Sequence, residues 1–364
     1  MNKERTGRIL KALKEMGLTQ MLIVDPMSIF YLTGVQVAPF ERFYGLYLRE
    51  DGRHAYFLNR LFHVPEDTGV EKVWYSDMDP VMELVAQHVD KEQVLGVDRE
   101  LKAGFLLPLM ELKAAKDFAE ASDAVDRTRA VKDEEEQEKM RLSSRINDLA
   151  MERFKDLIRE GITEAEAASG MLDIYRSLGA DGFSFEPLVA FGVNAADPHH
   201  APDGTVLRPG DAVLFDVGCI RDGYCSDMTR TFFYRQVKEE HRNIYDTVRR
   251  ANEAAIARIR PGIPLRELDQ TARSLIEAEG YGAYFTHRLG HFIGLGEHEH
   301  GDVSSVSEQK AEPGMIFSIE PGIYLPGDVG VRVEDLVLVT EDGCEVLNHF
   351  SKELEIIGSG EGGR

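Results

Sequence analysis

Residues 211–231 read DAVLFDVGCIRDGYCSDMTRT, and the pattern predicts two strands joined through a tight turn at Gly223. Asp216 ends the apolar run 212–215, and Asp227 follows eleven residues later. A carboxylate buried alone is costly, so each Asp needs a cation or several hydrogen-bond donors. Two strands joined by this turn could bring both carboxylates onto one sheet face. Two acids in a surface turn explain the same letters equally well.

Histidines gather in a second segment, THRLGHFIGLGEH at residues 286–298. Four of the chain's eleven histidines lie between residues 287 and 300, among them His287, His291 and His298. Glycines on both sides of His291 allow backbone to pack close to it. A single histidine is usually a structural residue, whereas a cluster among glycines favours a functional site.

Two glutamates stand in strand-like segments further along the chain. Glu320 lies in FSIEPG, and Glu334 lies in VRVED. Strand interiors seldom place a glutamate toward the core without a partner. Arg332 shares a face with Glu334 by the two-residue period of a strand, so a surface Arg–Glu pair is the alternative for this segment.

Taken together, these segments offer four carboxylates and one imidazole, from Asp216, Asp227, His291, Glu320 and Glu334. Two divalent cations would balance the four negative charges. Oxygen-rich ligation with one imidazole suits manganese, cobalt or iron, with zinc as a further alternative. Two such ions generate a bridging hydroxide at neutral pH and stabilise the oxyanion formed on attack at a carbonyl. We therefore predict a two-metal hydrolase.

The first third of the chain predicts a small α/β domain over residues 1–128, with a hairpin around Asp51-Gly52. Helical patterns cover 3–17, 82–89 and 101–112, and strand-like runs cover 21–24, 44–48, 55–58 and 94–97.

A mixed α+β domain is expected over residues 129–357, opened by a long helix after the charged run VKDEEE at 131–136. Further helices are predicted from Thr163, at 238–259 and at 265–279, and strands at 212–217, 229–234, 315–319 and 331–339. The glycine-rich segment 358–364 is expected to be a flexible tail.

The composition limits the classes of partner that the protein is expected to bind and indicates the cellular compartment in which it works. The 364 residues carry 42 basic and 64 acidic side chains, and the net charge of −22 argues against nucleic acids and anionic membranes as partners. No signal-peptide core or bilayer-spanning stretch is visible. Three cysteines without C-x-x-C spacing imply neither disulfides nor a zinc knuckle. We expect a cytoplasmic protein with reduced thiols.

The set D-V-G…D-M-T-R-T, G-H-F-I-G-L…H, S-I-E-P-G and V-R-V-E-D resembles the creatinase/prolidase/methionine aminopeptidase superfamily. The resemblance covers nearly the whole chain. It implies a C-terminal pita-bread metallopeptidase domain, which is α+β, preceded by a smaller α/β domain like those of the prolidase and aminopeptidase P branch. It also implies a homodimer.

The same resemblance assigns roles to the five candidate ligands. Asp227 and Glu334 would bridge two divalent metal ions in each subunit, and Asp216 would hold one of them. His291 and Glu320 would hold the other, and Glu320 would also handle the proton of the attacking water. Manganese is the expected ion, with cobalt or zinc as alternatives.

Further residues match family positions on the substrate side. His199 lies seventeen residues before the first ligand, and His298 lies seven residues past the ligand histidine. These two could steady the carbonyl and the leaving prolyl nitrogen. His287 and Arg332 match positions near the substrate, and Thr229 could donate a hydrogen bond to a ligand carboxylate.

The resemblance predicts an Xaa-Pro dipeptidase, or prolidase, acting on peptides with proline at the second position. The alternatives are an aminopeptidase P acting on longer peptides and a non-catalytic binding module of the same fold. Two positions depart from the family pattern. Phe292 replaces the usual small residue, and no basic residue directly follows His298-Glu299 to hold a dipeptide's carboxylate, a role that Arg332 could take.

Overall fold

The computed structural model describes residues 1–358, which form two compact units, Met1–Arg129 and a second one that begins at Ala130. The boundary expected between residues 128 and 129 lies one residue from this division. Apart from Gly358, the predicted tail 358–364 lies outside the described residues. Within residues 1–358, no helix is both long and apolar enough to cross a membrane.

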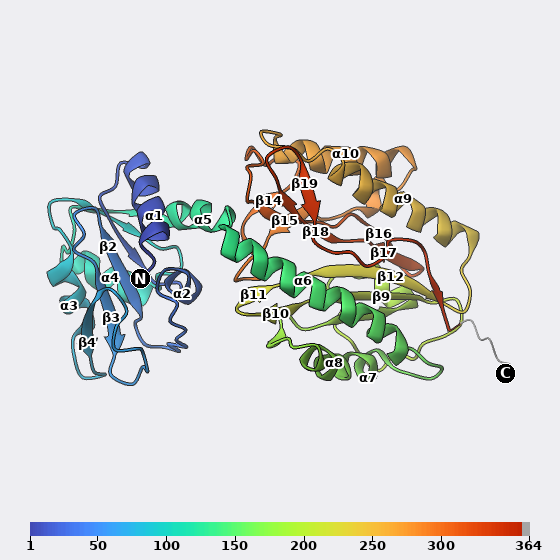
Figure 1. Ribbon diagram of the computed structural model, residues 1–364, viewed down its shortest axis with the longest axis horizontal. Coiled ribbons are helices and arrows are strands. Elements are labelled where there is room, and N and C mark those ends of the chain that lie inside the picture. The colour runs from blue at the N-terminus through green and yellow to red at the C-terminus, as the bar shows by residue number, and fades with distance from the viewer. Residues whose placement is uncertain (359–364) are drawn as a thin grey trace. The chain divides into compact units, whose positions relative to one another are not determined.

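The N-terminal unit is a six-stranded mixed sheet with helices packed on it (Figure 1). The strand order is β4-β3-β2-β1-β5-β6. Its strands are β1 (Gln20–Ile23), β2 (Gly45–Arg49), β3 (Ala55–Asn59), β4 (Glu71–Tyr75), β5 (Val94–Val97) and β6 (Asp117–Glu120). Its helices are α1 (Lys3–Glu15), α2 (Pro26–Thr33), α3 (Val81–His88), α4 (Ala103–Glu111) and α5 (Ser122–Ala130).

The predicted α/β elements of this unit are present, including the antiparallel β2–β3 hairpin. Sequence patterns missed α2, α5, β4 and β6. Asp25 caps α2 by accepting from the backbone of Met27 and Ser28, and Gly34 ends it in the left-handed conformation. At eight residues, this helix is too short to show a clear period.

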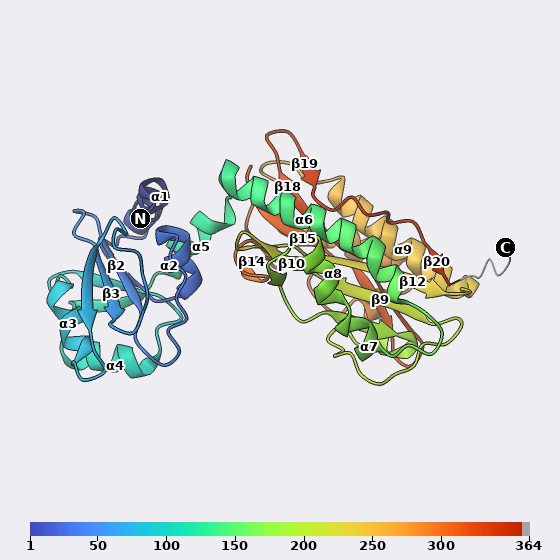
Figure 2. The same ribbon diagram turned by 60° about the horizontal axis from the view of Figure 1, so that its bottom comes forward.

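The larger unit places helices on both sides of its strands, as Figures 1 and 2 show. Helices α9 (Glu239–Ile256) and α10 (Leu265–Ala278) lie on one side, and α6 (Glu134–Phe154), α7 (Glu164–Ser169) and α8 (Met171–Ser177) lie on the other. A separate apolar core fills each side. Asp133 and Glu136 form a capping box at the start of α6, which explains why the helix begins inside the charged run.

Two main sheets build this unit, in the orders β20-β12-β9-β8 and β14-β13-β15-β18-β19. Two small ones, β11-β10-β7 and β16-β17, complete it. The strands are β7 (Gly182–Phe183), β8 (Leu188–Phe191), β9 (Ala212–Val217), β10 (Cys219–Arg221), β11 (Tyr224–Cys225), β12 (Met228–Tyr234), β13 (Gly290–Phe292), β14 (Glu299–Val303), β15 (Ile316–Ile319), β16 (Gly322–Leu325), β17 (Val329–Arg332), β18 (Asp335–Val339), β19 (Cys344–Val346) and β20 (Ile356–Ile357).

The single strand predicted over 331–339 is wrong, because the chain forms β17 and β18 with a break at Val333 and Glu334. At the break the chain passes from the small β16–β17 pair to the five-stranded sheet. The Glu334 amide donates to the Thr229 carbonyl instead of a neighbour in either pair. Apolar periodicity continues across this change of partner, so the letters alone do not reveal it.

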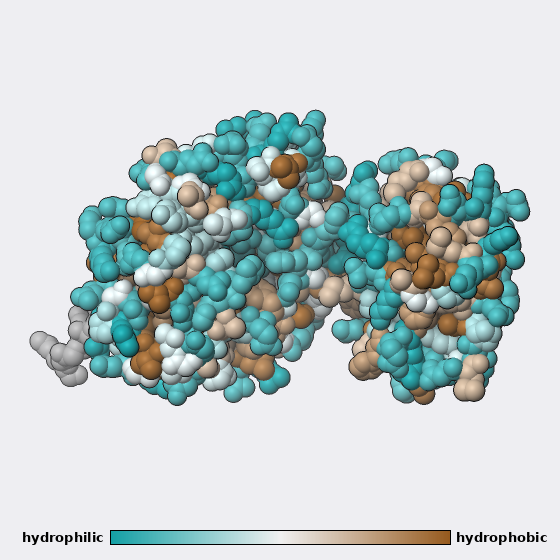
Figure 3. All heavy atoms as spheres, turned by 180° about the vertical axis from the view of Figure 1, so that it is seen from behind, coloured by the Kyte–Doolittle hydropathy of each residue, from teal (hydrophilic) through white to brown (hydrophobic). Residues whose placement is uncertain are grey.

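On the face shown in Figure 3, hydrophilic residues cover most of the larger unit. Charged side chains make up 29% of the chain, and side chains of this kind are mostly exposed in folded proteins.

Candidate metal centre

A cavity of about 530 Å³ opens in the larger unit, and the five predicted ligands line it together. Four of the substrate-side predictions, His199, His287, His298 and Arg332, also line it. Residues separated by more than a hundred positions in the chain therefore meet at one site, which excludes the interpretation of Asp216 and Asp227 as unrelated surface acids.

The two aspartates share one face of the β9–β12 pair. Along β9, Ala212 and Leu214 face one core and Val213, Phe215 and Val217 face the other, so the two-residue period carries Asp216 to the side of Ala212. Thr229 on β12 pairs with Asp216, and Asp227 lies two residues before Thr229 on the same face. The hairpin β10–β11 supplies the predicted turn, with Asp222 and Gly223 both in the left-handed conformation.

His291 stands at the centre of the carboxylates. Its Nε2 lies 3.6 Å from Asp227 Oδ2, 3.5 Å from Glu320 Oε1 and 4.0 Å from Glu334 Oε1. Its Nδ1 lies 3.2 Å from the Phe292 carbonyl oxygen, a contact that places the ring hydrogen on Nδ1. The lone pair of Nε2 is then available to bind a metal ion. Burial lowers the pKa of His291 to about 3, which keeps the ring neutral as a metal ligand must be.

The backbone of Ser318 packs directly against Gly290, next to this histidine, as the glycines around His291 predict. A Cβ on Gly290 would lie 1.9 Å from the Ser318 carbonyl oxygen, so no other residue fits there. Ser318 also accepts from the His291 amide at 3.0 Å and donates to Glu320 at 3.2 Å. One serine therefore holds two of the predicted ligands.

Two of the carboxylates use one oxygen for a hydrogen bond to the protein and leave the other oxygen available for a cation. Asp216 Oδ2 accepts from Arg332 at 2.5 Å, and Glu334 Oε2 accepts from Thr229 at 2.7 Å. The other oxygen of each, and Oδ1 of Asp227, is buried with no hydrogen-bond partner among residues 1–358. Ligand atoms of Asp227, His291 and Glu334 lie within 4.8 Å of one another. Buried, unpaired oxygens grouped around an imidazole are the donor set that divalent cations take.

Crowding of like charges shows in the acid–base properties. Burial, and next the Glu334 charge, raises the pKa of Asp227 well above its usual range. Burial and the Glu320 charge do the same for the pKa of Glu334. Burial raises the pKa of Glu320 to about 7. The site therefore holds its full negative charge only when compensating positive charge is bound.

The substrate-side histidines differ in their exposure. His298 and His199 are exposed, and the ring of His298 lies 4.0 Å from that of His291, centroid to centroid. His287 is half-buried and contacts the hydroxyl of Tyr324 at 2.9 Å. Arg332 is buried and donates to Asp216, Thr229 and Tyr324.

A second group of potential ligands, Glu164, His200 and Asp203, lies next to the loop that carries His199. Glu164 accepts there from the amides of Phe191 and Asp203, from Asn194 and from His200. Both of its oxygens are therefore satisfied by protein donors, and the group anchors the loop.

Two known families match most of this chain. The profile of metallopeptidase family M24 matches residues 138–341, and that of the creatinase/prolidase N-terminal domain matches residues 5–131. The chain belongs to metallopeptidase family M24. An uncharacterized peptidase of Staphylococcus aureus is 36% identical over 352 residues, which cover 96% of this chain and 99% of the relative.

Solved M24-like structures agree with the fold over nearly the whole chain. A dipeptidase from Pyrococcus horikoshii has a TM-score of 0.89 at 32% identity, covering 97% of this chain and 100% of that one. An Xaa-Pro dipeptidase from Bacillus anthracis has a TM-score of 0.89 at 30% identity, covering 97% and 99%. The predicted superfamily and the α+β pita-bread domain behind a creatinase-like domain are confirmed.

Phe292, which departs from the family pattern, does not enter the cavity. It follows His291 in β13, so its side chain points to the opposite face, where it is fully buried and packs against Phe317. His300, near the position of the missing basic residue, is exposed, whereas Arg288 and Arg332 line the cavity.

Sequence analysis missed Tyr324 and the buried Lys132–Glu299 pair. Tyr324 joins His287 to Arg332, and the two-residue period from Gly322 along β16 was the signal that could have found it. Lys132 Nζ lies 2.9 Å from Glu299 Oε2, and Glu299 also accepts from the Leu295 amide. This pair holds the segment that carries His298, but its partners lie 167 residues apart and leave no local pattern.

Titration of Glu320 gives a prediction for the protein stripped of metal by a chelator. An acid whose folded pKa is about 7, above its ordinary value of 4.5, stabilises the fold fully below pH 4.5 and loses that contribution as the pH rises through 7. The wild-type protein should therefore lose free energy of unfolding, relative to Glu320→Gln, between about pH 4.5 and 7. Urea denaturation at several pH values measures the difference, with exposed Glu253→Gln as the control. Parallel curves for wild type and Glu320→Gln would contradict the prediction.

Proposed function

We propose that this M24 metallopeptidase is an Xaa-Pro dipeptidase that uses two divalent metal ions per subunit. Manganese is the expected ion, and cobalt or zinc are the alternatives. The observation that supports two ions is the group of four carboxylates that line the cavity together with His291, three of which keep a buried oxygen without a protein partner among the described residues. Similarity to a dipeptidase and to an Xaa-Pro dipeptidase supports the substrate class.

When bound, the two cations would supply an activated water and a Lewis acid for the scissile carbonyl. The protein groups around them would orient the peptide and move protons. Glu320 has a pKa near 7, which suits a group that takes a proton from the attacking water and passes it on. An Xaa-Pro bond has no amide hydrogen, so His199 and His298 would steady the carbonyl and the leaving prolyl nitrogen.

An arginine side chain in the cavity that makes no ion pair with a described residue supports the dipeptide as substrate. Arg332 is already engaged by Asp216, Thr229 and Tyr324. Arg288 also lines the cavity and makes no ion pair with any residue in 1–358. His298 is exposed but lines the cavity, and partial desolvation there, followed by the Arg288 charge, lowers its pKa, so this guanidinium lies within electrostatic range of the reacting centre. Arg288, rather than Arg332, would therefore receive the carboxylate of a dipeptide.

Substrate length gives the direct test of the function. Purified protein in manganese should hydrolyse Gly-Pro and related Xaa-Pro dipeptides, measured by release of free proline, and should leave Xaa-Pro-Yaa tripeptides largely intact. Cleavage of tripeptides in preference would favour an aminopeptidase P. A protein that binds no divalent ion and cleaves neither substrate would favour the non-catalytic binding module.

Replacement of His298 separates its role from metal binding. In His298→Ala the kcat for a dipeptide should fall about a hundredfold or more, because a group that stabilises the transition state is lost. Metal content, measured by elemental analysis, should stay at the wild-type value. Exposed His300→Ala, close by in the chain, is the matched control and should keep its kcat. An equal loss of metal and activity in His298→Ala would refute the assigned role.

Replacement of Arg288 tests the carboxylate contact. In Arg288→Ala the KM for an Xaa-Pro dipeptide should rise about 10- to 100-fold, as expected for the loss of a charge-assisted hydrogen bond. The same dipeptide with an amidated C-terminus lacks the carboxylate and serves as the control, so its kcat/KM should hardly change. Equal losses for the acid and the amide would show that Arg288 does not bind the carboxylate.

A further inference from the structure

Glu320 and Glu334, the two glutamates of the cavity, both lie where a strand ladder is interrupted. β15 ends at Ile319, whose partner is Asp335, and the next pair, Gly322 with Arg332, belongs to the separate β16–β17 sheet. The residues between these pairs carry both glutamates and have no partner in either ladder. Regular sheet pairing therefore does not fix the spacing of the two carboxylates.

The side chain of Asn252 reaches this interruption from helix α9. It is fully buried, and its Nδ2 donates to the carbonyl of Ile319 at 2.8 Å and to that of Val333 at 3.4 Å. Each of these carbonyls belongs to the residue directly before a glutamate. One amide group therefore ties together the two backbone segments that present Glu320 and Glu334.

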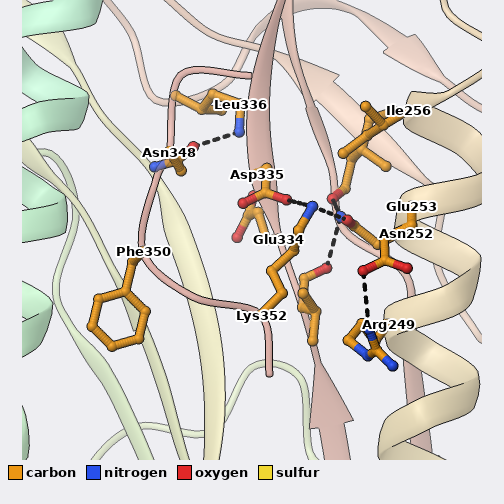
Figure 4. Close-up of polar contacts among 12 residues, drawn as sticks. Arg249, Asn252, Glu253, Ile256, Glu334, Asp335, Leu336, Asn348, Phe350 and Lys352 are labelled. Carbon is orange, nitrogen blue, oxygen red and sulfur yellow. Dashed lines mark hydrogen bonds and ion pairs between the residues drawn. The ribbon is translucent and has the colours of Figure 1, made fainter. Parts of the chain in front are cut away.

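Lys352 fixes the direction of that amide. Its Nζ donates to Asn252 Oδ1 at 2.9 Å and to Asp335 Oδ2 at 2.8 Å, as Figure 4 shows. Because the oxygen of Asn252 is held by a cation, its NH₂ group must point to the strands.

Asp335, directly after Glu334, joins this group to β12. Arg230 donates to Asp335 Oδ1 at 2.7 Å and to the Glu334 carbonyl. Burial alone would raise the pKa of the Asp335 carboxyl group, but the charges of Arg230 and then of Lys352 lower it below its usual value. The group is thus fully paired, so a change in one member is transmitted to the backbone of both glutamates.

We propose that Asn252 and Lys352 are positioning residues that set the spacing of Glu320 and Glu334 and thereby the affinity of the centre for divalent cations. This inference rests on the metal centre of the proposed function. Neither residue lines the cavity in the described chain, so they act only through the strand backbone.

Two variants separate the contacts. Asn252→Asp keeps an acceptor for Lys352 and removes both donors to the strands. Lys352→Met, at a side chain that is 22% exposed, leaves the Asn252 amide free to rotate. In each, the Kd for manganese, measured by calorimetry on chelator-treated protein, should rise about 10- to 100-fold, as for other groups that orient metal ligands. Lys352→Arg should restore most of the affinity.

Glu253→Ala is the matched control, because Glu253 is the next residue on α9 and pairs only with Arg249 in Figure 4. It should bind manganese as the wild type does. Melting temperatures of the metal-free proteins report on folding. If Lys352→Met melts as the wild type and binds manganese with the wild-type Kd, the positioning role is overturned. If the wild type binds no manganese, the metal centre itself is overturned, and the inference falls with it.

Discussion

Four carboxyl groups, two of them buried and two partly buried, share one cavity with a single imidazole, and this is the constraint on which the larger unit depends. Burial first, and then the repulsion between like charges, raises the pKa values of Asp227, Glu320 and Glu334. A fold can maintain such a group only if protein donors hydrogen-bond to the carboxylates and positive charge is bound in the cavity. Arg332, Thr229 and Ser318 donate to Asp216, Glu334 and Glu320 respectively, and divalent cations would supply the positive charge.

Much of this site could be predicted because its signals are local. Asp216 and Asp227 flank one hairpin, so the apolar run of β9 and the turn at Gly223 made a shared sheet face one of two interpretations, and the structure agrees with that one. The glycines around His291 indicated the close backbone approach that Gly290 makes to Ser318. These inferences need only the two-residue period of a strand and the small size of glycine.

The features that the sequence did not predict depend on contacts between segments that lie far apart in the chain. The break between β17 and β18 changes which sheet the chain belongs to without changing its apolar pattern. Asn252 reaches carbonyls 67 and 81 residues away, and Lys132 reaches Glu299 across 167 residues. A buried asparagine or lysine has no sequence signature that tells it from a surface residue, so only the packed structure reveals its partners.

The cavity contains positively charged side chains, although the whole chain carries a net negative charge. The net charge of −22 would disfavour a substrate carboxylate on the outside, yet the cavity contains Arg288 and Arg332. Two divalent cations would neutralise the four carboxylates, and Arg332 is already shared with Asp216. Arg288 makes no ion pair with a residue in 1–358, although Glu186 and Glu297 also line the cavity, so it would remain available to a substrate carboxylate. A zwitterionic dipeptide, small enough to enter whole, could use such a local charge, whereas a longer chain carries its carboxylate elsewhere. In the proposed function, a preference for short substrates would therefore follow from the position of Arg288 in the cavity rather than from the net charge of the chain.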